Sequence, residues 1–386
     1  MRKGVLYSLG LVIAVLVGLG LVVLFSASQV KGGGSYHDQF YFVKRQGMYL
    51  AMGMAIAVML ALVDYRVWRD HWSLTAMFGF IVFVALLAVF LFKPVKGSYR
   101  WIALGPFNFQ PGEFAKIATV LLVSVWLDLA AWRVELFVRG ALLPALIIGL
   151  IAGPVVLEPD FGSVMVIASV GFLLMFVAGS NFFHILPFGL AGIGVVGWKI
   201  FHNANRMARL AAFTGAAADP NAPADPAAYQ SDMSLVAIGR GRIFGVGLSN
   251  SMQKQNYLPE AWTDFIFAVG AEEMGLIFSV AVFALFVAFF FLCVHIARKA
   301  ADRFGRLIVI GMAFIIFFQA MFNLGVVCEA MPTKGMALPF FSYGGTNLLS
   351  AFFAVGTIFS VGLHSVQDRK RQVLARVVAR GRSDGR

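Results

Sequence analysis

The sequence is short of charged residues. Only 13% of its 386 residues are Asp, Glu, Lys or Arg, whereas a soluble domain carries about 25%. A water-soluble fold of this size would need more charge on its surface than the chain can supply. The shortage therefore argues against an ordinary soluble enzyme.

Cysteines and the familiar enzyme motifs are scarce as well. Cys293 lies within an apolar run and Cys328 near the end of another, so the two form no disulfide framework. The sequence contains no Walker A, HExxH, CxxC or GxSxG motif. We therefore expect no coupling to ATP.

Apolar residues make up 60% of the chain, and they gather in runs that suit a bilayer, which needs about 20 residues per helix. The runs predict an all-α integral membrane protein with about ten transmembrane helices. These are expected at residues 5–27, 46–64, 72–92, 112–129, 140–157, 162–179, 183–200, 265–296, 306–328 and 346–364. The first run is too long for the apolar part of a signal peptide. Residues 1–366 would form one polytopic domain and residues 367–386 a basic cytoplasmic tail.

The positions of Lys and Arg predict the orientation in the membrane. If the N-terminus lies inside, the inner segments carry more basic residues than the outer ones, so we expect both termini in the cytoplasm. The long hydrophilic segment 201–264, before the eighth helix, then lies outside the cell membrane. The net charge of +12 comes from residues beside the spans and in the tail. That placement suits lipid headgroups, and we expect no nucleic-acid partner.

Four polar clusters lie at the predicted outer ends of spans, where a charge that entered the membrane would cost about 2.5–3.5 kcal/mol. The first, RWIALGPFNFQPGEFAK (100–116), contains Arg100, Gln110, Glu113 and Lys116. Its glycines and Pro106 predict a turn or re-entrant loop, and Pro111 fits the first turn of a helix. Glu113 and Lys116, three residues apart, share one helix face. The cluster can bind an anionic headgroup or form a structural ion pair, and the residues alone favour neither.

The second cluster is LEPDFGS (157–163), in which Glu158 and Asp160 flank a proline between two apolar runs. It can be an ordinary outer turn or a broken helix that lines a cavity. A turn accounts for the proline and glycine, but it explains less well why two acids lie there.

The third cluster, NYLPEAWTDFIFAVGAEEMG (256–275), contains Glu260 and Asp264 in a loop that enters a helix. Asp264 can cap that helix, or it can act as a general base on a membrane-anchored substrate. The apolar run that follows is too long for one vertical crossing. We expect its first two turns, from Phe265 to Gly275, to lie near the interface.

The fourth cluster, EAMPTKGMALPFFSYGGTN (329–347), places Lys334 among apolar residues. Its residues 342–345, beginning with Ser342, could present backbone N–H groups to phosphate oxygens. Glycine-rich sequence before a span is common, so this pattern is weak by itself. On the residues alone, a transporter would be the leading interpretation.

These clusters, in this order and spacing, resemble the FtsW/RodA (SEDS) family across nearly the whole chain. The matching strings are RWIALGPFNFQPGEFAK, EPDFGS, GRGRIFGVGLSNSMQKQNYLPEAWTDFIFAVGAEEMG and MPTKGMALPFFSYGG. NSMQKQNYLPEAWTDFIF and MPTKG look more like the division type (FtsW) than the elongation type (RodA). The resemblance implies a glycosyltransferase that polymerises lipid II at the outer face of the cytoplasmic membrane and releases undecaprenyl diphosphate. It also implies a class B penicillin-binding transpeptidase and other divisome membrane proteins as partners, and a place at the division septum.

The resemblance also assigns roles to residues. The family's essential aspartate falls on Asp264, its loop acid and lysine on Glu113 and Lys116, its arginine on Arg100 and its later lysine on Lys334. The predicted substrate-binding residues are Arg100, Gln110, Glu113, Lys116, Glu158, Asp160, Glu260, Lys334 and Ser342. Three positions depart from the family: Trp262, where His or another polar residue is frequent, Glu158, where Gln is frequent, and Thr346-Asn347, where Ser-Ser or Ser-Ala is usual.

One base and several cations suffice for this inverting transfer, because diphosphate is already a good leaving group. Asp264 is the expected base toward the sugar 4-hydroxyl, and Arg100, Lys116 and Lys334 would neutralise the diphosphate. A divalent cation, Mg²⁺ or Mn²⁺, is possible, with Glu113 as a candidate ligand. The alternatives are a lipid II flippase, which performs no chemistry, and a membrane scaffold for division proteins.

Overall fold

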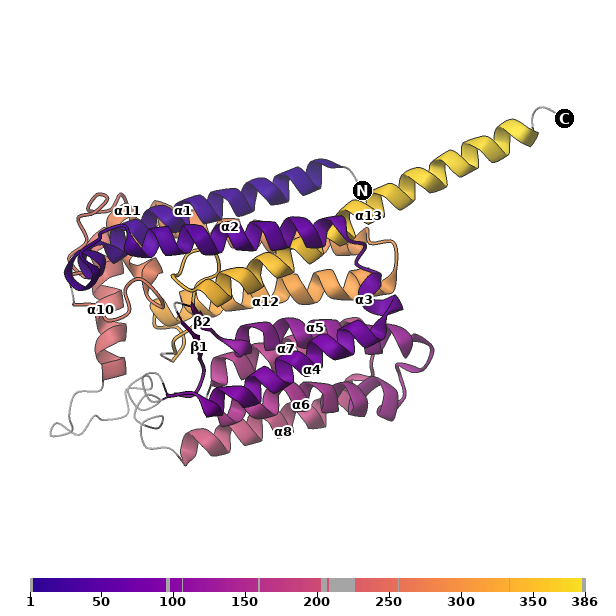
Figure 1. The fold of residues 1–386 in the computed structure, drawn as a ribbon, viewed down its shortest axis with the longest axis horizontal. Coiled ribbons are helices and arrows are strands. Elements are labelled where there is room, and N and C mark those ends of the chain that lie inside the picture. Colours follow the sequence, from indigo (N-terminus) through magenta and orange to yellow (C-terminus); the bar gives the residue numbers. More distant parts are fainter. Residues whose placement is uncertain are drawn as a thin grey trace.

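The structure is a computed structural model that describes residues 3–94, 98–105, 107–158, 160–202, 207, 226–255, 257–332 and 334–383. Long helices run along its long axis and form an elongated bundle (Figure 1). They are α1 (Lys3–Tyr36), α2 (Tyr41–Leu62), α4 (Trp72–Ala88), α5 (Pro111–Leu129), α6 (Leu143–Leu157), α7 (Phe161–Val177), α8 (Phe182–Phe201), α11 (Ile266–Arg298), α12 (Arg303–Val327) and α13 (Gly345–Ser383). Each predicted span coincides with one of them.

Within the described ranges, eight helices are long and apolar enough to cross a membrane. The other two predicted spans correspond to α5 and α7. Helix α7 is short, with 17 residues, and α5 carries Glu113, Lys116 and Asp128. These charges make α5 less apolar than the other spans. Two of them, Glu113 and Lys116, belong to the candidate site described below.

The remaining elements are short. They are α3 (Val67–Asp70), η1 (Val89–Leu91), η2 (Ala131–Arg133), η3 (Phe137–Leu142), α10 (Pro226–Gly241), β1 (Ile102–Leu104) and β2 (Phe107–Phe109). The predicted helical membrane fold is confirmed, and its two short strands β1 and β2 pair antiparallel with Ile102 opposite Phe109. Gly105, with φ of 62°, supplies the left-handed backbone of the turn. Pro111 begins α5, as predicted.

Both termini lie at one end of the bundle, and α10 lies at the other (Figure 1). We call these the terminal end and the α10 end. Helices α5, α7, α11 and α13 all begin at the α10 end (Figure 1). Residues 226–255 and 257–264, the larger described part of segment 201–264, thus lie at the end opposite the termini.

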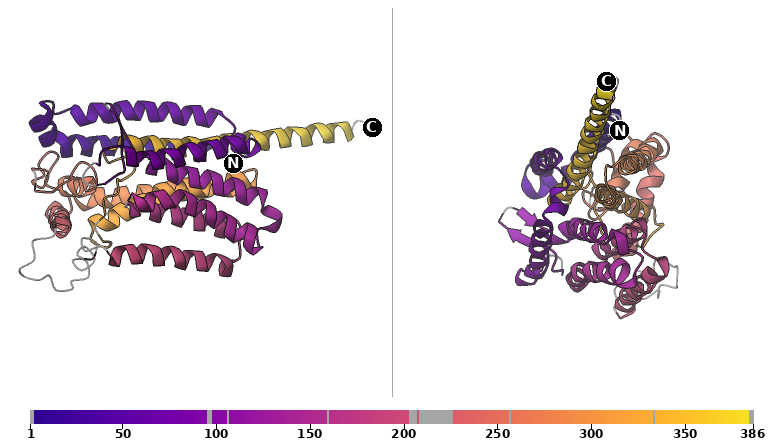
Figure 2. Two further views of the ribbon diagram at one scale, coloured as in Figure 1. Left: turned by 60° about the horizontal axis from the view of Figure 1, so that its bottom comes forward. Right: turned by 90° about the vertical axis from the view of Figure 1, so that its right-hand side faces the viewer.

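Burial is concentrated in α12 and the first part of α13, whose apolar stretches are 72% and 78% buried, whereas that of α8 is 6% buried. Figure 2 shows α8 at the periphery. Small residues let α13 approach α2 closely. A methyl group added at Gly356 would lie 2.7 Å from the backbone of Ala57, which is the close approach that glycine permits between membrane helices.

Helix α11 is broken at Gly275, whose φ is 74°. The predicted first part, from Phe265 to Gly275, is therefore a separate helical segment. The break leaves backbone groups without their helical partners, and the stretch Arg242–Gly247 binds them. Val246 N and Gly247 N donate to the carbonyls of Glu272 and Glu273, while Leu276 N donates to Arg242 O. The end of α10 is thereby fixed to the helix that follows Asp264.

Candidate active site

The four predicted clusters converge at the α10 end, where α5, α7, α11 and α13 begin (Figures 1 and 2). Residues far apart in the chain lie in contact there, such as Gln110 and Thr346, which are 236 positions apart. The convergence makes this end of the bundle the candidate site.

Glu113 and Lys116 form a buried ion pair in the first two turns of α5. Lys116 Nζ lies 2.8 Å from Glu113 Oε1, and the lysine is only 1% exposed. The second carboxylate oxygen accepts hydrogen bonds from Asn347 Nδ2 at 3.0 Å and from Ser350 Oγ at 3.2 Å. The predicted pairing on one helix face is confirmed. Asn347 and Ser350, which join α13 to this pair, were not among the predicted site residues.

Asp160 caps the N-terminus of α7 and is buried. Its carboxylate accepts a hydrogen bond from Ser163 Oγ at 2.8 Å and from Gln110 Nε2 at 3.4 Å. Burial opposes ionisation, but the positive charges of Arg100 and Lys334 outweigh it, and the pKa of Asp160 lies below its ordinary value. Asp160 is therefore a buried carboxylate held charged by cations from two other clusters.

Glu158 lies beside it in the break between α6 and α7 and is 1% exposed. Burial raises its pKa to about 8, the charge of Asp160 adds to the rise, and Arg100 opposes it. Among the described residues, its Oε1 has no hydrogen-bond partner. Two acids two residues apart thus differ in protonation near neutral pH, because only one is surrounded by enough cations and donors.

Lys334 joins the second cluster to the fourth. Its Nζ lies 5.2 Å from the ring centre of Phe161, within the range of a cation–π contact. A methyl group added at Gly162 would lie 3.1 Å from Lys334 Cε. The glycine thus allows the lysine to cross the start of α7 and reach the surroundings of Asp160.

Asp264 lies half-buried in the loop before α11. The interpretation of this residue as the helix cap is wrong, since the capping position of α11 is Phe265. Asn323 Nδ2 holds the loop by donating to Asp264 O at 2.7 Å and to Met336 O at 2.6 Å. A methyl group added at Gly335 would lie 2.5 Å from Asp264 Oδ2. The carboxylate is thus packed against the residue next to Lys334.

Glu260 and Ser342 hold the same loop. Glu260 adopts φ of 56°, and its carboxylate accepts a hydrogen bond from Thr263 Oγ1 at 3.1 Å. Ser342 is 3% exposed; its hydroxyl donates to Thr263 O and accepts from Leu338 N at 2.7 Å. These bonds give both side chains a role in shaping the loop.

The backbone N–H groups after Ser342 are engaged inside the protein. Ser342 N donates to Leu338 O at 3.0 Å, and Tyr343 N donates to Trp262 O at 3.0 Å. Gly344 N donates to Gln46 Oε1 at 3.5 Å. The expectation that these three groups bind phosphate is therefore wrong. They join the loop of Asp264 to α2 and α13.

A buried acidic pair that was not predicted as part of the site lies in the first segment of α11. Glu272 and Glu273 are 0% and 1% exposed. Lys254 Nζ lies 3.0 Å from Glu273 Oε1 and 2.8 Å from Ser26 Oγ. Glu272 accepts hydrogen bonds from Ser251 Oγ and from the backbone N–H groups of residues 252 and 253. The pair secures the stretch 251–254 and α1 to the helix that follows Asp264.

The possible metal ligand Glu113 has both oxygens engaged, one by a lysine. Within the part of the chain that the structure describes, no group of three or more His, Cys, Asp or Glu side chains gathers. The residues of the site thus offer cations and hydrogen-bond donors, which suit an anionic ligand.

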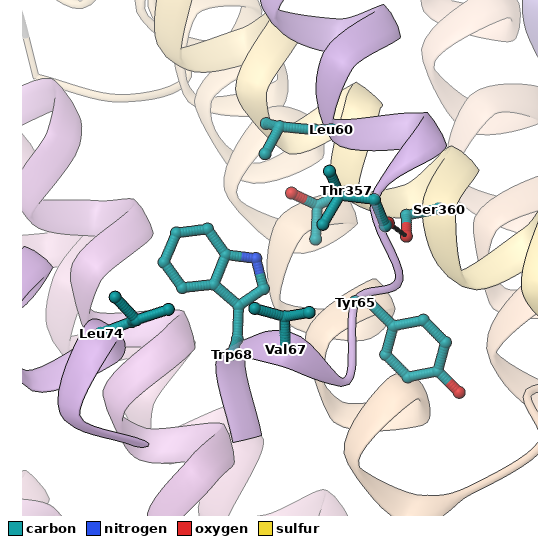
Figure 3. Close-up of a pocket in the computed structure, with 8 residues that line it drawn as sticks. Leu60, Tyr65, Val67, Trp68, Leu74, Thr357 and Ser360 are labelled. Atoms are coloured by element: carbon teal, nitrogen blue, oxygen red, sulfur yellow. Dashed lines mark hydrogen bonds between the residues drawn. The ribbon is translucent and has the colours of Figure 1, made fainter. Parts of the chain in front are cut away.

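A hollow of about 170 Å³ lies where α3 joins α2 and α4, away from the α10 end (Figure 3). Apolar side chains of Leu60, Val67, Trp68 and Leu74 line it. The hydroxyls of Thr357 and Ser360 at its wall donate to Phe353 O and Val63 O. With its polar groups engaged, this hollow offers little for catalysis and is separate from Asp264.

Known proteins resemble the chain over nearly its whole length. It matches the family FtsW/RodA/SpoVE, described as "Cell cycle protein", over residues 7–367. It is 36% identical to the probable peptidoglycan glycosyltransferase FtsW of Trichlorobacter lovleyi, with 91% of each chain covered. The protein of the same description from Coxiella burnetii is also 36% identical, with 90% of this chain and 93% of the relative covered.

Two solved structures have similar folds. One, described as "Structural coordination of polymerization and crosslinking by a peptidoglycan synthase complex", gives a TM-score of 0.73 at 25% identity and covers 94% of this chain and 98% of that one. The other is the rod shape determining protein RodA of Thermus thermophilus, with a TM-score of 0.66 at 24% identity, covering 94% of this chain and 96% of that one. The second likeness shows the fold alone.

Proposed function

The chain belongs to the FtsW/RodA/SpoVE family, and we propose that it is a peptidoglycan glycosyltransferase that joins lipid II units into glycan strands during cell division. The relatives named as peptidoglycan glycosyltransferases support this function. The observation that carries it is the position of Asp264, whose carboxylate is packed against Gly335, next to a lysine that reaches the buried Asp160 region. A carboxylate and several cations are thereby placed around one spot at the α10 end.

In the proposed reaction, Asp264 takes the proton of the acceptor's sugar 4-hydroxyl. The freed oxygen attacks the anomeric carbon of the donor from the face opposite the leaving group, and the configuration inverts. The bond from that carbon to the diphosphate oxygen breaks, and undecaprenyl diphosphate leaves with the electron pair. No acid is needed to protonate the leaving oxygen, because diphosphate is stable as an anion.

Cations stabilise the departing diphosphate. Lys334 and Arg100 act on the same region as Asp160, and we assign them to the phosphate oxygens. Lys116 is buried and bound to Glu113. Its charge therefore acts on the diphosphate from inside the protein, without direct contact. Asp160 and Glu158 then set the balance of charge around these cations.

The other predicted substrate-binding residues fit a positioning role. Gln110 donates to Asp160, and Glu260 and Ser342 bind Thr263, the neighbour of Asp264. We assign these three to holding the acids in place. We also propose that a divalent cation, if one takes part, binds to the phosphate oxygens of the diphosphate itself.

The complex of polymerization and crosslinking with a similar fold supports a transpeptidase partner. We propose a class B penicillin-binding protein and other divisome membrane proteins as partners, and the division septum as the location. The outer face of the cytoplasmic membrane is the proposed site of polymerisation, with the α10 end outside.

The test is polymerisation of purified lipid II by the protein with its transpeptidase partner. Asp264→Asn should lower the rate by about 100-fold or more, as expected for loss of a general base. Asp232→Asn, which changes an exposed acid on α10, is the matched control and should polymerise normally. Wild-type rates from Asp264→Asn would end the base assignment. Transport of lipid II with no growth of the glycan would instead identify a flippase.

A further inference from the structure

Aromatic residues from four segments gather beside the loop of Asp264, on the side of α1 and α2. We call Tyr36, Tyr41, Phe42, Trp262 and Tyr343 the aromatic patch. Phe42 is buried, Trp262, Tyr41 and Tyr343 are half-buried, and Tyr36 is 48% exposed. The patch thus has a buried centre and a rim that a ligand can reach.

The rings contact one another in a continuous series. Tyr36 stacks on Tyr41 with ring centres 3.9 Å apart. Phe42 packs edge-on against Tyr36, Tyr41 and Tyr343, at 5.6, 5.3 and 4.9 Å, and lies 5.9 Å from Trp262. Such ring contacts are attractive beyond the burial of their apolar area. The patch is therefore a pre-organised surface.

Hydrogen bonds fix the patch to the loop of Asp264. Tyr343 N donates to Trp262 O at 3.0 Å. Gln46, one turn after Phe42 in α2, donates to Ser342 O at 3.0 Å. Trp262 itself is two residues before Asp264. Any group that packs on these rings is held at a defined place relative to the carboxylate.

Two cations border the rings. Arg45 donates to the hydroxyl of Tyr41 at 3.0 Å. Lys31 Nζ lies 5.8 Å from the ring centre of Trp262, near the outer limit of about 6 Å for a cation–π contact. The lysine is exposed, so a ring-shaped ligand can displace it from Trp262 at small cost.

The surroundings of Asp264 are therefore divided. Lys334, Arg100 and Lys116 lie toward α5 and α7, where a diphosphate would be bound. The aromatic patch lies toward α1 and α2 and offers apolar ring faces with few charges. A glycosyl transfer needs both surfaces, because one substrate presents its diphosphate to the reaction and the other presents a sugar hydroxyl.

We propose that the aromatic patch binds the acceptor amino sugar, with its apolar C–H face on Trp262 and Tyr41 and its 4-hydroxyl toward Asp264. Aromatic side chains combine a large apolar face with a polar tip, which matches a pyranose ring that has C–H groups on its faces and hydroxyls at its edge. Arg45 and Lys31 would meet the carboxylates that the acceptor carries. The proposal rests on the proposed function.

The competing explanation is an aromatic belt at the membrane interface, which Trp and Tyr commonly form. Belt residues anchor single helices to the headgroup region. Here the rings come from the end of α1, the start of α2 and two loops, and Phe42 at their centre is 5% exposed.

The test measures ligand binding in the catalytically inactive Asp264→Asn protein in nanodiscs. The probe is the soluble disaccharide of N-acetylglucosamine and N-acetylmuramic acid, without lipid or diphosphate, observed by saturation-transfer NMR. Trp262→Leu should weaken its binding about tenfold, as loss of one aromatic contact predicts. Trp262→Phe should restore most of the binding. Inorganic diphosphate, the second probe, should bind Trp262→Leu normally and bind Lys334→Met more weakly.

Trp132→Leu is the matched control, because Trp132 is 68% exposed and lies in η2, beyond the end of α5 that is opposite the α10 end; it should bind the disaccharide normally. Equal disaccharide binding by Trp262→Leu and the Asp264→Asn parent would overturn the proposal, and so would a parent that binds diphosphate but no disaccharide. Lipid II polymerisation by the protein with Asp264 intact is measured separately. It decides the proposed function independently of these binding results.

Discussion

Lys254 and Glu273 form a buried ion pair, with Nζ and Oε1 3.0 Å apart, that ties the loop before Asp264 to the helix after it. Both residues are almost fully buried. A buried pair costs desolvation energy, and breaking it by removing one partner leaves an uncompensated charge.

Removal of either partner of this pair should destabilise the fold. We expect Lys254→Met to lower the free energy of unfolding by about 3–5 kcal/mol. The double variant Lys254→Met/Glu273→Leu should recover much of that loss, because no buried charge remains. Unfolding of the purified protein in detergent, followed by intrinsic fluorescence, measures both. Equal losses in the single and double variants would show that packing, and not charge, decides stability here.

Glu158 should make stability depend on pH. Its pKa is about 8 in the fold against an ordinary 4.5, so the folded state holds a proton that the unfolded chain releases. Stability is highest below about pH 4.5 and falls as pH rises through 8. Glu158→Gln, which stays neutral, should be more stable than wild type by on the order of 4 kcal/mol at pH 8.

Melting temperatures of wild type and Glu158→Gln across pH 5 to 8 provide the measurement. The difference should widen with pH, whereas Glu135→Gln, a change at an exposed glutamate, should keep a constant difference from wild type. A gap that does not change with pH would contradict the raised pKa.

Gly335→Ala should impair catalysis more than stability. The added methyl group would lie 2.5 Å from Asp264 Oδ2, so the carboxylate must move. A displacement of about 1 Å can lower a rate about 100-fold. Gly344→Ala is the control, because its methyl group would meet Asn347 Cβ at an ordinary 3.5 Å. Lipid II polymerisation rates and melting temperatures of both variants decide the matter; a Gly335→Ala protein with normal rates would disprove the close packing.

Asn347→Leu should destabilise the ion pair in α5. It removes the 3.0 Å hydrogen bond to Glu113 Oε2 and leaves that oxygen with the hydrogen bond from Ser350 Oγ. Loss of a hydrogen bond to a charged group costs about 1.5–3 kcal/mol. Asn347→Ser, closer to the family's usual residue, should cost less, since a hydroxyl can still donate through a water molecule. The free energy of unfolding of the two variants ranks them, and the reverse order would refute the role of this hydrogen bond.

Much of the fold can be predicted from the sequence because it depends on local patterns. The apolar runs identify each long helix, and the three-residue spacing of Glu113 and Lys116 predicts their pairing. The interactions of Glu273 with Ser26, and of Glu113 with Asn347, join residues more than 200 positions apart. No local pattern specifies such contacts, since they follow from how the helices pack.

The loop after Lys334 shows a second limit of sequence reasoning. Its glycines indicated free N–H groups, but those of Ser342, Tyr343 and Gly344 are bound to other segments. Buried backbone donors almost always find partners, and which partner each finds depends on the tertiary structure. The residues that support Asp264, such as Asn323, were missed for the same reason.

The main-chain hydrogen bonds between Arg242–Gly247 and the break in α11 determine which residues can be substituted there. Main-chain atoms make the contacts, so the side chains of Ile243 and Phe244, which are exposed, are open to exchange during evolution. Gly245 and Gly275 are different, because a methyl group at either would overlap the opposing main chain. Related chains should therefore differ in the exposed side chains of this stretch and keep these two glycines.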